Sequence, residues 1–189
     1  RFLRGVVDSQ DLSLNVSREH LQHDPVVGKI RQGLVKRVLD ALKKKAEKAP
    51  EDYARFWETF GPVLKEGLYE DAERRETLLE LARFRSSAVE GWTSLADYKS
   101  RMKPGQQSIY YISGESAAKL KDSPQLEGFV DKGVEVLLLA DPVDDFWVPA
   151  VGGYGELPLR SVTRAGTELE QIDGDEDKAD KAEKDADEK

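Results

Sequence analysis

The sequence predicts an α/β protein in which a helical region precedes a small layered domain. Apolar residues recur at every third or fourth position in much of residues 25–105, a spacing typical of amphipathic helices. Short, continuous apolar runs follow at 108–112 and 134–139, as expected for strands that are covered on both faces. From residue 167 onward charged residues dominate, which predicts a disordered acidic tail.

Four regions follow from these patterns. Residues 1–24 comprise a strand, Arg1–Val7, and a polar loop, and we interpret them as the end of a larger α/β subdomain. Residues 25–105 form a helical connector and residues 106–166 a small α-β-α subdomain. Residues 167–189 form the tail.

The first expected helix begins at Pro25, with Asp24 as its N-cap. Its apolar face repeats every fourth residue, and the helix should end at Ala49–Pro50 because a residue before proline disfavours helical geometry. The face consists of Val26, Ile30, Leu34, Val38 and Leu42.

Three further helices are expected in the connector. One carries an aromatic stripe, Tyr53, Phe56, Trp57 and Phe60, and should end at Gly61–Pro62. The next should span residues 71–84. The last should begin at Ser94, where Asp97 completes a capping box.

The C-terminal pattern predicts a short parallel sheet with helical crossovers. Its strands are expected at 108–112, 134–139 and 157–162, with helices beginning at Ser123–Pro124 and Asp141–Pro142. The run Gly152–Gly155 lacks the spacing of a phosphate-binding loop and is interpreted as a flexible turn.

Composition excludes several classes of function. The net charge is −8, and the last 17 residues hold nine acids and four lysines, so no broad basic field favours nucleic acid binding. The chain has no cysteine, which excludes a disulfide framework and favours a reducing, cytoplasmic location. No apolar run is long enough for a membrane span. His20 and His23 lack a third ligand, so no metal site is expected.

The most informative segment is NVSREHLQ, from Asn15 to Gln22, within the string that begins at Arg1. It resembles the catalytic loop of the middle domain in heat-shock protein 90 chaperones, including the bacterial type. The stretch SLADYKSRMKPGQQSIYYISGES from Ser94 and the stretch KGVEVLLLADPVDDFWVP from Lys132 are also similar to that family. The family usually has proline at the position of Ser13, so the loop is expected to be less rigid here.

The resemblance implies that the chain is a middle-domain fragment of an ATP-dependent chaperone. Arg18 would reach the γ-phosphate of ATP, which together with Mg is held by a separate N-terminal domain, and Gln22 would support that contact. A guanidinium suits the charge that develops on the phosphoryl oxygens. If the segment is helical, Arg18 and Gln22 share one face. The fragment alone should not be catalytic.

The segment with Phe146 and Trp147 has two interpretations. The pair could belong to the core of the small domain, or it could form an apolar patch that binds unfolded client proteins, as the resemblance implies. Co-chaperones are further expected partners. The family dimerises through a domain that is not recognisable here, so the full-length protein is expected to be a homodimer and this chain a monomer.

Two rival hypotheses remain open. The same region could be a non-catalytic scaffold for clients or co-chaperones, with Arg18 only locking domains together. An unrelated α/β enzyme could instead use Asp141, Asp144 and Asp145 as acids or metal ligands, although no base or nucleophile is evident beside them.

Overall fold

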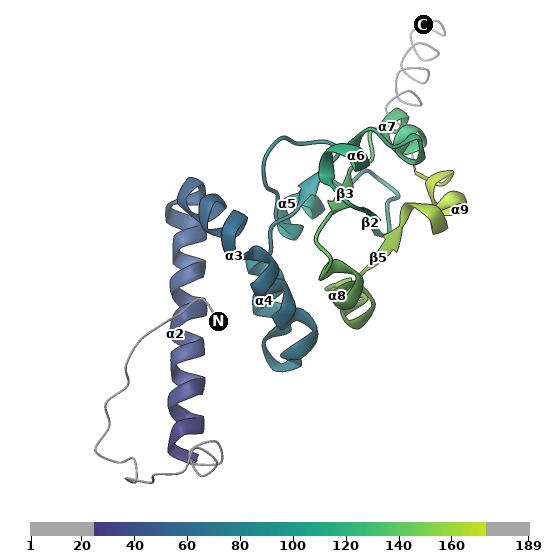
Figure 1. Ribbon diagram of the computed structural model, residues 1–189. Helices are drawn as coiled ribbons and strands as arrows, with labels where there is room; N and C mark the ends of the chain where they lie inside the picture. Colours follow the sequence, from purple (N-terminus) through teal and green to yellow (C-terminus); the bar gives the residue numbers. More distant parts are fainter. Residues whose placement is uncertain (1–24, 173–189) are drawn as a thin grey trace, which may run out of the picture. The chain divides into compact units, whose positions relative to one another are not determined.

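The computed structural model describes residues 25–172, and these form two compact units that divide between Phe60 and Gly61 (Figure 1). Each unit is described by itself below. The strand and loop expected in residues 1–24 lie outside the described residues. The second unit begins at Gly61 and so includes residues 61–105, which the sequence assigned to the helical connector.

The first unit contains α2, Pro25–Lys48, and the beginning of α3, Pro50–Glu70. The bounds of α2 confirm the helix that the fourfold apolar repeat predicts. Leu39 and Leu42 are buried on it. On α3, Tyr53 and Trp57 are almost fully buried and their ring centroids lie 6.2 Å apart. The aromatic stripe therefore serves packing, as expected for Trp57.

The expected end of the aromatic helix at Gly61–Pro62 is wrong, because α3 continues through both residues to Glu70. Proline removes one backbone hydrogen bond inside a helix, which costs roughly 3 kcal/mol. Burial downstream offsets this cost: Leu64 and Leu68 are 9% and 1% exposed. Tertiary packing thus overrides the local signal for termination.

The next helix is shorter than expected. A 3-10 turn, η1 (Ala72–Arg74), leads into α4, Arg75–Leu81, and Ala82 already has an extended backbone. The residues that follow are extended. Phe84 forms a β-bridge with Thr93, and β1 (Arg85–Ser86) pairs with a strand of the sheet. The helix expected over residues 71–84 therefore ends at Leu81, and Phe84 lies in a β-bridge instead.

The expected capping box at Ser94 is confirmed, and it starts α5, Leu95–Ser100. The Asp97 backbone N–H donates to Ser94 Oγ at 3.0 Å, while the Ser94 N–H and hydroxyl donate to the Asp97 carboxylate. The hydrogen bond from Ser94 holds the pKa of Asp97 below its usual value.

The sheet has the strand order β1-β3-β2-β5-β4. The three expected strands are confirmed and are parallel to one another: β2 (Ile109–Ser113) lies between β3 (Val136–Leu139) and β5 (Leu157–Ser161). The antiparallel edges β1 and β4 (Gly153–Tyr154) were not expected. Gly153 belongs to a close hairpin rather than a flexible turn, because a Cβ there would lie 2.6 Å from the Leu157 carbonyl oxygen.

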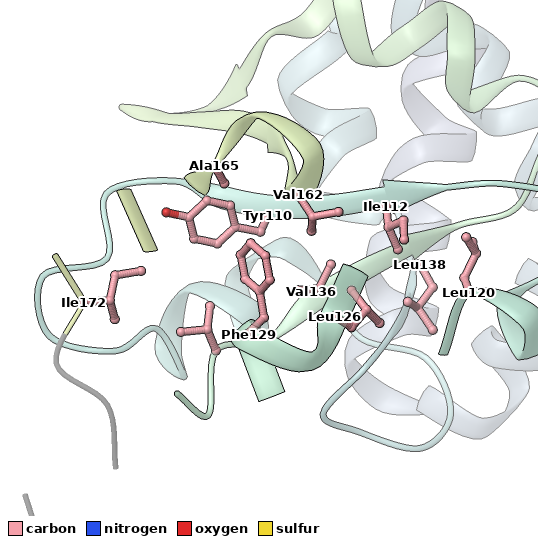
Figure 2. Close-up of a cluster of buried hydrophobic side chains, with 11 residues drawn as sticks. Tyr110, Ile112, Leu120, Leu126, Phe129, Val136, Leu138, Val162, Ala165 and Ile172 are labelled. Atoms are coloured by element: carbon pink, nitrogen blue, oxygen red, sulfur yellow. The ribbon is translucent and has the colours of Figure 1, made fainter. Parts of the chain in front are cut away.

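Helices cover both faces of this sheet, which confirms the α-β-α layering. The connection from β2 to β3 contains α6 (Ala117–Lys121), η2 (Pro124–Leu126) and α7 (Glu127–Asp131). Their buried side chains pack on alternate strand residues such as Tyr110 and Val136 to form the core in Figure 2. The connection from β3 to β5 contains α8, Asp144–Val151, on the opposite face.

The acidic tail begins later than expected. After η3 (Val162–Arg164), residues 166–169 form α9 (Gly166–Leu169), and Ile172 is only 2% exposed within the core of Figure 2. Lys132 Nζ donates to the Ile172 carbonyl oxygen at 2.8 Å. Two apolar residues, Leu169 and Ile172, thus anchor a segment whose charge predicted disorder. Residues 173–189 lie outside the described residues.

A buried tyrosine links α5 to the sheet. The Tyr98 hydroxyl donates to the Glu135 carbonyl oxygen at 2.7 Å and accepts from Gln106 Nε2 at 2.9 Å and from the Tyr110 N–H at 3.0 Å. Burial raises the pKa of Tyr98, so the phenol keeps its proton. Three polar groups therefore depend on one hydroxyl.

Replacing Tyr98 with phenylalanine is expected to lower the free energy of unfolding by about 2 to 3 kcal/mol, because the Gln106 amide and two backbone groups lose a partner in a buried place. Urea unfolding of the chain measures this change. Tyr111→Phe, at a half-buried position on the next residue of β2, is the matched control and should change stability by less than about 0.5 kcal/mol. Equal losses in both variants would contradict the role given to the Tyr98 hydroxyl.

Candidate functional site

The candidate residues from the sequence fall into two groups. Arg18 and Gln22 lie outside the described residues, so their roles stay predictions. Phe146 and Trp147 lie on α8, in the second unit.

The two aromatic residues of α8 have opposite environments. Phe146 is 63% exposed, whereas Trp147 is 0% exposed. The Trp147 ring lies 5.7 Å from the Phe84 ring, and its Nε1–H donates to Asp144 Oδ1 at 2.6 Å. Trp147 therefore lies in the core of this unit and Phe146 at its surface. Client binding by these residues stays a prediction.

A buried lysine holds the beginning of α8. Lys65 of α3 is 3% exposed, and its Nζ donates to Asp141 Oδ2 and to Asp144 Oδ1, both at 2.8 Å. The other oxygen of Asp144 accepts the Asp141 backbone N–H at 3.0 Å. The network fixes α8, and with it the backbone that carries Phe146.

The same network removes the acids from other chemistry. Asp141 and Asp144 are bound to Lys65, which leaves Asp145 as the one exposed carboxylate of the trio. Between residues 25 and 172, no group of three His, Cys, Asp or Glu residues could hold a metal ion. These contacts favour a structural role for Asp141 and Asp144 over the enzyme hypothesis.

Phe146 has an aromatic neighbour that the sequence did not reveal. Tyr69, near the end of α3, is 37% exposed, and its ring centroid lies 6.0 Å from that of Phe146. Among residues 25–172, four large apolar side chains are exposed, and two of them, Tyr69 and Phe146, contact each other through their rings. Tyr69 was missed because the helix that carries it was expected to end eight residues earlier.

The second unit is therefore a small α/β domain that presents an exposed aromatic pair, Tyr69 of α3 and Phe146 of α8, and buried ion pairs fix the beginning of α8. No helix among residues 25–172 has the length and apolar character needed to cross a membrane. The family model described as Hsp90 protein matches residues 1–189, and the chain belongs to the Hsp90 family.

Similar proteins agree with this assignment. A bacterial relative named chaperone protein HtpG, from Paramagnetospirillum magneticum, is 61% identical over 181 residues, 96% of this chain and 29% of that protein. The protein of the same name from Roseobacter denitrificans is 58% identical over 98% of this chain and 30% of its own length. The chain thus spans less than a third of either relative.

A solved structure indicates which domain of an Hsp90 protein this chain resembles. The middle domain of a heat shock protein from Plasmodium falciparum matches with a TM-score of 0.68 and 30% sequence identity, over 76% of this chain and 61% of that chain. The expected resemblance to the Hsp90 middle domain is confirmed, and so is the α/β fold.

Proposed function

We propose that this chain is the middle region of an ATP-dependent chaperone that assists the folding of client proteins in the cytoplasm. Membership of the Hsp90 family and similarity to proteins named as chaperones support this proposal. In the full-length protein, a homodimer, the region supplies an arginine to ATP and part of the client-binding surface. By itself the chain turns over no ATP and is a monomer.

ATP and Mg belong to a separate N-terminal domain. The donors of residues 25–172 do not fit a magnesium site, since Asp141 and Asp144 already bind Lys65. When ATP and Mg are bound there, they supply the phosphoryl group and its charge neutralisation. Closure of the dimer then brings the catalytic loop of this chain to the nucleotide.

Arg18 contacts the γ-phosphate and Gln22 supports that contact. Arginine keeps its charge at every physiological pH, and its planar fork matches phosphate oxygens. The loop sequence that resembles the family's catalytic loop supports these roles, and α2 begins three residues after Gln22.

Phe146 contributes to the client-binding surface. The observation that carries this part of the proposal is its 63% exposure on a helix whose beginning is fixed by the buried Lys65. A rigidly held, exposed aromatic ring loses little conformational entropy on binding, and non-native clients offer apolar side chains to it. Tyr69 extends the apolar contact.

Replacing Phe146 with serine is expected to weaken the binding of an unfolded client about 5- to 30-fold, because roughly 1 to 2 kcal/mol of apolar burial is lost. Stability should change little, since the ring is mostly exposed. Titration of the full-length protein with a fluorescently labelled, permanently unfolded client measures the affinity.

Val130 provides the matched control, since it is 60% exposed on α7, on the opposite side of the sheet. Val130→Ser should leave client affinity unchanged. Equal weakening in both variants would point to non-specific apolar adhesion and would contradict a client site at Phe146.

A non-catalytic scaffold for clients or co-chaperones is the alternative function. The aromatic pair supports it as well as it supports the first proposal, because both need an exposed binding surface. The two functions differ in the effect of Arg18 on ATP turnover.

A further inference from the structure

A groove of about 420 Å³ lies between α8 and the sheet, on the face opposite the core of Figure 2. Tyr111 of β2 and Leu159 of β5 line it from the sheet, and Val148 and Pro149 line it from α8. Ser113, Leu139 and Ser161, which also line it, are the last residues of the three parallel strands.

This position is a usual place for a ligand. The connection that follows β2 passes over one face of the sheet through α6 and α7, and the connection that follows β3 passes over the other through α8. In open α/β sheets, crevices outside the carboxyl ends of strands bind ligands where successive connections diverge in this way. The groove lies at that point.

The charges around the groove favour a cation. Asp144, Asp145 and Arg164 line it, and Asp144 shares Lys65 with Asp141. Three carboxylates thus face two cations, which leaves one net negative charge. Asp145 is exposed and carries the carboxylate that Lys65 does not bind. The negative charge is concentrated at the α8 side of the groove.

The remaining lining suits a long side chain with a cationic end. Val148, Leu159 and the Tyr111 ring offer apolar contact for a methylene stem, and a phenol ring attracts a cation at its face. Ser161 and Thr163, whose hydroxyl oxygens lie 2.9 Å apart, can accept hydrogen bonds from an ammonium or a guanidinium group.

We propose that the groove receives a lysine or arginine side chain of an extended client segment, beside an apolar client residue that contacts Phe146. This inference rests on the proposed client site, because Asp145 lines the groove and Phe146 is the next residue of the same helix. An extended segment places alternate side chains on one face and advances about 3.3 Å per residue, so client residues two positions apart can reach both places. Asp145 selects for the positive charge and Arg164 limits the groove to a single cation.

The test uses three labelled peptides that are identical except for the residue two positions after a central phenylalanine, which is lysine, glutamine or glutamate. Fluorescence anisotropy with the 189-residue chain gives their affinities. The lysine peptide is expected to bind about 5-fold more tightly than the glutamine peptide, and the glutamate peptide most weakly. Asp145→Asn should remove this preference, whereas Arg164→Gln should increase it. Both positions are exposed, so the fold should persist.

A glutamate peptide that binds most tightly, or a lysine preference that persists in Asp145→Asn, would overturn the inference. Phe146→Ser distinguishes it from the proposed function. That variant should weaken all three peptides alike and leave the charge preference intact. If it weakens none, while Asp145→Asn still abolishes the preference, the role of Phe146 fails and the groove assignment stands. If Phe146→Ser weakens the binding of all three peptides, but neither the unmodified chain nor any variant prefers the lysine peptide, only the groove assignment fails.

Discussion

Replacing Arg18 with alanine in the full-length protein is expected to lower the rate of ATP hydrolysis at saturating ATP by roughly 10³-fold, the lower end of the range for arginine fingers. The affinity for ATP should change little, because the proposed function places the nucleotide on a separate domain. The guanidinium acts on charge that develops as the phosphoryl group is transferred, so its removal raises the barrier without weakening ground-state binding. Steady-state turnover and a nucleotide titration measure the two quantities.

Arg31→Ala is the control, since Arg31 is an exposed residue of α2 that follows the loop closely. It should leave turnover within about 2-fold of the unmodified protein. A matching loss of ATP affinity and rate in Arg18→Ala would instead indicate a docking residue. That outcome would favour the scaffold over the ATP-dependent chaperone.

Replacing Lys65 with alanine is expected to lower the free energy of unfolding by about 3 to 5 kcal/mol, the usual cost of removing one partner from a buried ion pair. Asp144 is 1% exposed and would keep an uncompensated charge. Its remaining donors are the Trp147 Nε1–H and the Asp141 N–H. Two-state urea denaturation of the chain measures the loss.

Two comparisons make this prediction specific. Lys119→Ala removes an exposed ion pair with Glu115, whose side chains are 73% and 83% exposed, and should cost less than about 0.5 kcal/mol. Adding Asp144→Asn to Lys65→Ala should recover part of the loss, because the buried charge is removed while an oxygen stays for Trp147. A loss below about 1 kcal/mol in Lys65→Ala would contradict the structural role of the network.

Local patterns predicted the elements that depend on local chemistry. The start of α2 at Pro25 and the capping box at Ser94 follow from the preferences of single residues for helix ends. The three parallel strands follow from continuous apolar runs, which only a sheet covered on both faces buries.

Long-range contacts explain where the sequence misled. Gly61–Pro62 is a strong local stop signal, but Leu68 finds burial that only the folded domain supplies. The strands β1 and β4 have two residues each, too few for any periodicity to appear. The tail was placed too early because the anchoring of Ile172 depends on a core built from distant segments.

In the candidate site, too, local sequence patterns predicted some features, and long-range contacts determined the rest. The family resemblance identified the segment that forms α8, but the sequence does not show which of the adjacent residues Phe146 and Trp147 is exposed. The structure distinguishes them because they lie on different sides of the helix. Lys65 gave no signal, because its carboxylates lie 76 and 79 residues away in the chain. Tyr69 was hidden by the misplaced helix end.

The most direct test compares ATP turnover in Arg18→Ala and Phe146→Ser within the full-length protein, at saturating ATP and without client. The proposed function separates the catalytic loop from the client surface. It predicts that Arg18→Ala loses nearly all turnover and that Phe146→Ser keeps the basal rate of the unmodified protein. Full turnover in Arg18→Ala would contradict the claim that this region supplies the catalytic arginine.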